Sequence, residues 1–170
     1  VAAIAKSHQG FVNVYSEVGQ GAQFKLYIPA LTTDIEENEP DNKILQHDGK
    51  GTTILIVDDE EPILSMLSAV LADYNYKVLT ATDGIQAIGL FTTTPDIQVV
   101  ITDMNMPKMD GATLIRTLHA IRPGLSIIAT SGLPERDIHH EDIRRMIVSF
   151  LMKPYRTEAV LKELSRILES

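Results

Sequence analysis

Five short apolar runs in the last two-thirds of the chain constrain its fold more than any other feature. They are TILIV (53–57), KVLTA (77–81), IQVVI (97–101), SIIAT (126–130) and VSFLM (148–152). Between them lie segments whose apolar residues repeat with helical spacing, such as Leu114, Leu118 and Ile121. Parallel strands need crossover connections, so this alternation predicts an α/β fold, a doubly wound (βα)5 parallel sheet with helices on both faces. Continuously apolar strands indicate that both faces are buried.

Polar and charged residues follow most of these runs, at the edge where open parallel sheets bind ligands. The first run continues into Asp58-Asp59-Glu60-Glu61 and the third into Asp103. The fourth ends at Thr130-Ser131-Gly132 and the fifth at Lys153-Pro154. The second ends in Thr82-Asp83-Gly84, which is typical of a turn. The sequence therefore predicts that three carboxylates, a hydroxyl group and an ammonium group converge on one crevice.

Carboxylates this close repel one another, by about 4 kcal/mol per pair at ~4 Å and an effective dielectric constant of about 20. Lys153 supplies one compensating charge, and a hard divalent cation can supply the rest. Ligands that are all oxygen favour Mg²⁺, which also binds phosphate oxygens readily. The pattern indicates a site for a phosphoryl group, in which Asp103 is the nucleophile while Lys153 and the Ser131 hydroxyl bind the phosphoryl oxygens.

Four motifs in register resemble the receiver domain of two-component response regulators, over residues 52–170. They are VDDE at 57–60, D-x-x-M-P-x-x-D-G at 103–111, Ser-Gly at 131–132 and Lys-Pro at 153–154. The resemblance implies a flavodoxin-like receiver fold with strand order 2-1-3-4-5. It also implies that Asp103 is the phosphoacceptor, and that Asp58, Asp59, Asp103 and the backbone carbonyl of Asn105 hold Mg²⁺. By the same resemblance, Lys153 contacts the acyl phosphate.

The same resemblance assigns Ser131 and Phe150 to the pair of residues that receivers use as a switch. Thr130 stands beside Ser131, and the sequence leaves open which of these two hydroxyl groups points inward. Phe150 occupies a position where tyrosine is common, so a signal carried by a phenol hydrogen bond is absent there. Rotation of the ring remains available as a switch.

The first 31 residues carry a second resemblance. VAAIAKSHQGFVNVYSEVGQGAQFKLYIP is similar to the final helix and hairpin of a histidine-kinase ATP-binding domain, with GQGAQF (19–24) as its last glycine box. This implies that 1–31 is a C-terminal remnant of that domain, cut from a longer chain, and that 32–51 is an acidic linker. The asparagine that holds Mg²⁺, the D-x-G-x-G loop and the helix with the phosphorylatable histidine are missing. We therefore expect no ATP binding and no kinase activity from this fragment itself.

Together these resemblances predict the receiver of a hybrid histidine kinase in a phosphorelay, which would catalyse its own phosphorylation and dephosphorylation. The implied partners are the phosphohistidine domain of a kinase and a histidine phosphotransfer protein. The alternative is a pseudo-receiver that acts only as an interaction module. A dehalogenase-type phosphatase needs a second acid where Asn105 stands. A flavodoxin-like cofactor carrier must seat a phosphate after the first strand, where four carboxylates would repel it.

Composition limits the kinds of partner and the cellular compartment that this chain can have. The formal net charge of −8 makes nucleic acid a poor partner, because a phosphate backbone requires a basic surface. The chain has no cysteine, which excludes disulfides and fits a reducing compartment. No apolar run is long enough to span a membrane, so we expect a cytoplasmic fragment, which is compatible with a membrane anchor elsewhere in the parent kinase. Apolar surface on the N-terminal hairpin would allow a homodimer.

Overall fold

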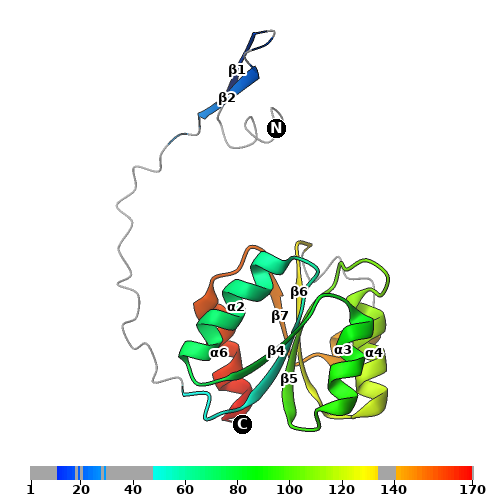
Figure 1. Cartoon of the computed structure of the whole chain (residues 1–170). Coiled ribbons are helices and arrows are strands. Elements are labelled where there is room, and N and C mark those ends of the chain that lie inside the picture. The colour runs from blue at the N-terminus through cyan, green and yellow to red at the C-terminus, as the bar shows by residue number, and fades with distance from the viewer. Residues whose placement is uncertain are drawn as a thin grey trace. The chain divides into compact units, whose positions relative to one another are not determined.

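The computed structural model describes residues 11–17, 19, 21–27, 29, 48–133 and 141–169. The chain divides into two compact units, Val1–Lys43 and Ile44–Ser170 (Figure 1). The helix expected before residue 11 and most of the expected linker, residues 32–47, lie outside the described residues. Within the described residues, no helix combines the length and hydropathy needed to cross a membrane.

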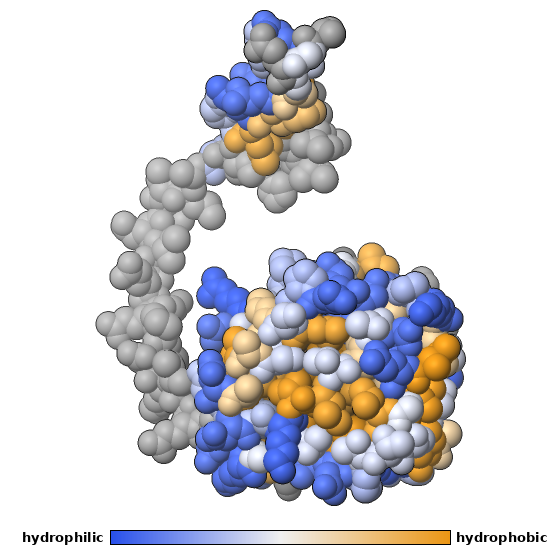
Figure 2. Space-filling view, viewed as in Figure 1, coloured by the Kyte–Doolittle hydropathy of each residue, from blue (hydrophilic) through white to orange (hydrophobic). Residues whose placement is uncertain are grey.

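The first unit contains an antiparallel hairpin of β1 (Phe11–Glu17) and β2 (Gly21–Tyr27). Gly19 and Gly21 have φ angles of +84° and +88°, which favour glycine at this turn. The rings of Phe11 and Tyr27 stack across the strands with centroids 4.7 Å apart. Figure 2 shows apolar side chains on the surface of the hairpin, and Val14 and Phe24, which face each other, are both more than half exposed.

The second unit is a five-stranded parallel sheet in the order β4-β3-β5-β6-β7. Its elements in chain order are β3 (Thr53–Val57), α2 (Glu61–Asp73), β4 (Lys77–Ala81), α3 (Gly84–Thr93), β5 (Ile97–Asp103), α4 (Gly111–Ile121), β6 (Ser126–Ser131), α5 (Glu141–Met146), β7 (Ser149–Met152) and α6 (Thr157–Leu168). Counted within this unit, the strand order is 2-1-3-4-5. The structure thus confirms the predicted fold.

Helices cover both faces of the sheet, with α2 and α6 on one face and α3 and α4 on the other (Figure 1). Alternate side chains of β3 enter two separate hydrophobic clusters. Leu55 joins the cluster that includes α3, α4 and α5, whereas Ile54 and Ile56 join the one that includes α2 and α6. All five residues of β3 are buried, which explains why its sequence is continuously apolar.

Residues 48–52 pack against the turn between α2 and β4. The Gly49 N–H donates to the Tyr74 carbonyl at 2.7 Å, and the Gly51 N–H donates to the Asn75 carbonyl at 2.8 Å. A Cβ atom at Gly49 would lie 2.6 Å from the ring of Tyr76, so the close approach requires glycine. These contacts fix the chain to the domain before β3 begins.

An aspartate caps the helix that follows the central strand. Asp110 is the N-cap of α4, and its carboxylate accepts a hydrogen bond from the Thr113 N–H at 2.7 Å. Replacing Asp110 with alanine should lower the free energy of unfolding by about 1 kcal/mol, because the first turn loses its side-chain acceptor. Urea denaturation measures this. Asp96→Ala, on an exposed loop, is the control and should change stability by less than about 0.5 kcal/mol.

Candidate functional site

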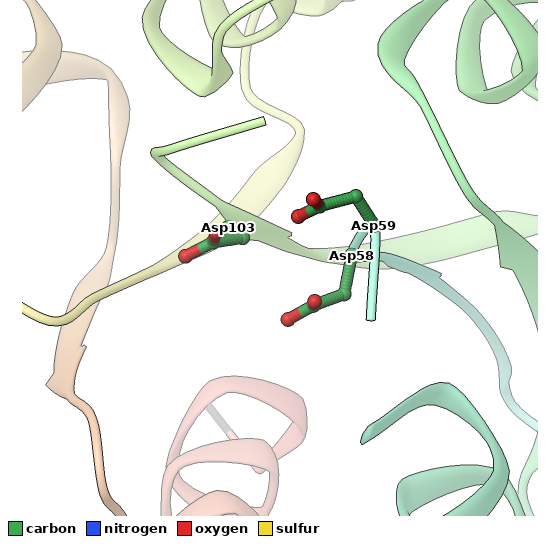
Figure 3. A group of neighbouring side chains, drawn as sticks. All are labelled: Asp58, Asp59 and Asp103. Atoms are coloured by element: carbon green, nitrogen blue, oxygen red, sulfur yellow. The ribbon is translucent and has the colours of Figure 1, made fainter. Parts of the chain in front are cut away.

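Three carboxylates meet where the two central strands end. Asp58 and Asp59 follow β3, and Asp103 is the last residue of β5. Figure 3 shows their side chains next to one another, and one oxygen atom from each lies within 4.8 Å of the others. Asp58 and Asp103 are only 2% and 5% exposed, whereas Asp59 is exposed. The predicted convergence of these acids is therefore present.

Lys153 follows β7 and extends its ammonium group into this cluster. Its Nζ atom lies 2.7 Å from Asp58 Oδ2, 3.3 Å from Asp103 Oδ1 and 3.8 Å from Glu60 Oε1. Burial opposes the charge of Lys153, but the hydrogen bond to Asp58 and the charge of Asp103 outweigh burial and raise the pKa of Lys153 above its usual value. The ammonium group therefore stays charged at neutral pH.

The surroundings of Asp103 disfavour the charged form of its carboxyl group. Burial is the main cause that raises its pKa; the charge of Lys153 opposes this and that of Asp58 adds to it. The backbone N–H of Asn105 also acts to lower the pKa of Asp103, and Oδ1 has no hydrogen-bond partner among the described residues. Lys153 Nζ lies 3.3 Å from Oδ1 and pairs with its charge. An oxygen atom in this state can act as a nucleophile.

The donor set fits a hard divalent cation. The three clustered carboxylates face a single ammonium group, which leaves two negative charges uncompensated. All the available ligand atoms are oxygen, the preference of Mg²⁺. Asn105 lies in the loop directly after Asp103, and the role predicted for its backbone carbonyl stays a prediction.

The two neighbouring hydroxyl groups of β6 make different contacts. Ser131 Oγ accepts hydrogen bonds from the Leu133 N–H at 3.0 Å and from Asn105 Nδ2 at 3.4 Å, which leaves its own proton free to donate. Thr130 Oγ1 instead donates to the Thr102 carbonyl at 3.4 Å. Phe150 is half-buried and packs on the cluster that includes α4 and α5. Ser131 therefore contacts the loop after Asp103, and its role as a switch residue stays a prediction.

Glycine is required where α4 begins beside Asp103. A Cβ atom at Gly111 would lie 2.3 Å from the Asp103 carbonyl oxygen and 2.7 Å from Met104 Cα, both of them backbone atoms. The Gly111 N–H also donates to the Met104 carbonyl at 3.1 Å. The Asp-Gly pair at 110–111 thus caps the helix and lets it approach the phosphoacceptor candidate closely.

Two neighbours of the site are not predicted by the sequence. Asp83, read as a turn residue, caps α3 and pairs with Lys108 at 2.9 Å, which ties the loop after β4 to the loop after β5. Tyr155 is half-buried and packs on the hydrophobic cluster that includes α2 and α6. Its only sequence signal is its position two residues after Lys153.

The raised pKa of Asp103 predicts a pH-dependent stability in metal-free protein. The protonated form favours folding, so this contribution is lost as the pH rises from the usual aspartate pKa of about 3.9 through the raised folded value. Asp103→Asn should therefore be more stable than the wild type near pH 7 in EDTA, and the difference should shrink below about pH 4. Urea denaturation across this range tests the prediction; a variant less stable at neutral pH would contradict it.

Comparisons with known proteins agree with this geometry. Residues 54–165 match the model of the response regulator receiver domain. The sensor kinase CckA of Brucella abortus is 29% identical over 98% of this chain, which spans only 18% of that protein. A receiver domain structure from Clostridium thermocellum is 28% identical with a TM-score of 0.65, and covers 69% of this chain and 94% of its own.

A further solved structure supports the fold alone, because its identity is low. The response regulator TrrA of Thermotoga maritima, solved in complex with Mg²⁺ and BeF, is 21% identical with a TM-score of 0.60. The match covers 68% of this chain and 98% of that one. With the family model matching well over half of the chain, the protein belongs to the response regulator receiver domain family of two-component systems.

Proposed function

We propose that this chain is the receiver module of a hybrid sensor histidine kinase, and that Asp103 accepts a phosphoryl group from a phosphohistidine. The group then passes to a histidine phosphotransfer protein or regulates the kinase. The similarity to CckA, a sensor kinase, supports the hybrid context because it extends over both units of the chain. In this proposal residues 1–31 are the end of the ATP-binding domain and 32–51 the linker.

The single observation that carries the proposal is the buried carboxylate of Asp103, whose Oδ1 atom lies 3.3 Å from Lys153 Nζ and has no hydrogen-bond partner among the described residues. In the proposed reaction a carboxylate oxygen of Asp103 attacks phosphorus and a new P–O bond forms. The P–N bond to the histidine breaks, and the imidazole nitrogen keeps the electron pair. The negatively charged oxygens of the transferred phosphoryl group then lie next to Lys153, whose ammonium group stabilises their charge.

Lys153 and Ser131 bind the transferred group in this scheme. Lys153 is held by Asp58 in the resting site, so it exchanges part of that contact for the phosphoryl oxygens. Ser131 donates its hydroxyl proton, which none of its present hydrogen bonds uses. Receiver domains bind Mg²⁺ at an acidic pocket, and here Asp58, Asp59, Asp103 and the Asn105 carbonyl would hold it. Bound there, Mg²⁺ would neutralise charge on the carboxylates and the phosphoryl oxygens.

Phosphorylation would add about −1.5 to −2 charges at Asp103. Ser131 would move towards the new group, and Phe150 would change its ring position in response. The surface of α5, β7 and α6 would then change its affinity for partners. Val148 and Met152, which are 42% and 54% exposed, supply apolar contacts on this surface.

Phosphoramidate tests the proposal, because its P–N bond imitates that of phosphohistidine. Incubation of the chain with phosphoramidate or acetyl phosphate in Mg²⁺ should add one phosphoryl group, detected by intact-mass spectrometry. EDTA should suppress the uptake. A pseudo-receiver would take up no phosphoryl group from either donor, and that result would overturn the proposal.

A further inference from the structure

Three acids surround the ammonium group of Lys153, and they differ in their exposure to solvent. Asp58 Oδ2 lies 2.7 Å from Lys153 Nζ and Asp103 Oδ1 lies 3.3 Å from it, and the side chains of both acids are buried. Glu60 Oε1 lies 3.8 Å from the same nitrogen atom, but the side chain of Glu60 is 63% exposed. Glu60 is therefore the one acid of the three that solvent reaches freely.

The side chain of Glu60 is not used by the helix that follows it. Glu60 is the N-cap of α2, but its carboxylate forms no capping hydrogen bond. Only its backbone caps the helix, because the Glu60 carbonyl accepts from the Ile63 N–H at 2.9 Å and from the Leu64 N–H at 3.2 Å. The Glu60 N–H donates to Asp58 Oδ1 at 2.9 Å, which fixes the residue beside the site. Within the described part of the chain, the ion pair with Lys153 is the only polar contact of this carboxylate.

The contact between Glu60 and Lys153 is the weakest of the three and the easiest to break. A distance of 3.8 Å is too long for a hydrogen bond, so this contact is an ion pair alone. Exposed ion pairs contribute little, whereas separating the buried pair of Lys153 and Asp58 leaves a charge without its partner. A phosphoryl group that binds the ammonium group therefore displaces least when its oxygens approach on the Glu60 side.

The negative charge of Glu60 also acts on a group that approaches Asp103. Because Lys153 Nζ lies 3.8 Å from Glu60 Oε1 and 3.3 Å from Asp103 Oδ1, these two carboxylate oxygens are at most about 7 Å apart, less than the Debye length of about 8 Å at physiological ionic strength. An anionic donor that reaches Asp103 is thus repelled by Glu60 without full screening by salt. The repulsion grows in proportion to the net charge of the donor.

We propose that Glu60 is a specificity-determining residue for the phosphoryl donor: its charge disfavours small dianionic acyl phosphates relative to donors whose phosphorus is bonded to nitrogen. The inference rests on the proposed function, since it concerns the group that Asp103 receives. Acetyl phosphate is a dianion at neutral pH, whereas phosphoramidate, whose nitrogen is protonated, is a net monoanion. A phosphohistidine shares the P–N bond, and its imidazole can also carry a proton. Glu60 thereby reduces phosphorylation by free acyl phosphates.

The test compares initial rates of phosphorylation by the two donors at saturating Mg²⁺, measured by intact-mass spectrometry. In both reactions a P–O bond forms at Asp103. With acetyl phosphate the P–O bond to acetate breaks and acetate leaves with the electron pair; with phosphoramidate the P–N bond breaks and ammonia leaves with the pair. Glu60→Gln keeps the size of the side chain and removes its charge. It should raise the rate about three- to tenfold with acetyl phosphate and about two- to threefold with phosphoramidate, which has half the net charge.

Two variants and a change of salt serve as controls. Glu61→Gln removes the same charge from the next residue, which is exposed and is not among the described acids that pair with Lys153, and should change both rates by less than about twofold. Glu60→Asp keeps the charge and should keep the wild-type preference between the donors. Sodium chloride at about 1 M, where the Debye length is about 3 Å, should reduce the difference between Glu60→Gln and the wild type.

The outcomes separate this inference from the function on which it rests. If the wild type takes up no phosphoryl group from either donor, the proposed function fails. If the wild type is modified and Glu60→Gln reacts at the wild-type rate with both donors, only the inference fails. A slower Glu60→Gln variant, or an equal gain with both donors that salt does not change, would show that Glu60 acts on the structure of the site and would also overturn the inference. Urea denaturation of each variant confirms that the compared proteins are folded.

Discussion

Replacing Asp103 with asparagine is expected to abolish uptake of a phosphoryl group from acetyl phosphate or phosphoramidate. The amide is uncharged and is a far weaker nucleophile towards phosphorus than a carboxylate. Asp58, the other buried carboxylate of the cluster, already accepts hydrogen bonds from Lys153 Nζ and the Glu60 N–H. Loss of a nucleophile lowers rates by at least about a thousandfold. Intact-mass spectrometry over time measures the effect.

The matched control for this variant is Asp96→Asn, an exposed aspartate on the loop before β5. It should be modified as fast as the wild type. Because Asp103→Asn is expected to be at least as stable as the wild type in EDTA, a loss of uptake is not explained by unfolding. Equal modification of Asp103→Asn would place the acceptor elsewhere and contradict the assignment.

Replacing Lys153 with methionine should be the most destabilising single change at the site. It leaves the buried carboxylates of Asp58 and Asp103 without their cation, whereas the methionine chain keeps most of the packing. Leaving a buried charge unpaired typically costs about 3–5 kcal/mol. We expect a loss in the lower part of this range near pH 7 in EDTA, because the side chain of Lys153 is 17% exposed.

A second lysine gives a direct comparison. Lys108→Met breaks an ion pair with Asp83 in which the lysine is 67% exposed, and should cost less than about 1 kcal/mol. The contribution of Lys153 to stability should also depend on pH in a definite direction. The folded pKa of Lys153 is raised, so its contribution to stability is present below the usual lysine pKa of about 10.4 and is lost above the folded value. Equal costs for Lys153→Met and Lys108→Met would argue against a buried charge cluster.

The strands could be predicted well because buried strands have apolar sequences, and this pattern can be seen in the sequence alone. TILIV coincides with β3 and KVLTA with β4, and the other three runs differ from their strands by one or two residues at an end. β5 extends beyond IQVVI to Asp103 because its pairing with β6 continues to Asp103 and Thr130. Thr102 and Asp103 interrupt the apolar pattern of β5, so the pattern ends before the strand does.

The part of the site that could be predicted consists of residues at the ends of strands. Asp58, Asp103 and Lys153 are far apart in sequence, but parallel strands bring their ends to one edge, and the structure places them within ion-pair distance. The choice between Thr130 and Ser131 could not be made, because it depends on which neighbours each hydroxyl reaches. Tyr155 could not be predicted either, since its packing on the cluster of α2 and α6 arises only when the turn after β7 folds back onto the sheet.

We propose that one site at the ends of β3, β5, β6 and β7 receives the phosphoryl group. Titration of ¹⁵N-labelled protein with Mg²⁺ and then beryllofluoride, a phosphoryl mimic, tests this proposal. We expect shifts in the amide signals of the site residues Asp58, Asp59, Asp103, Ser131 and Lys153, and we expect Asp103→Asn to lose the response to beryllofluoride. Unchanged signals at these residues, or shifts confined to another part of the chain, would contradict it.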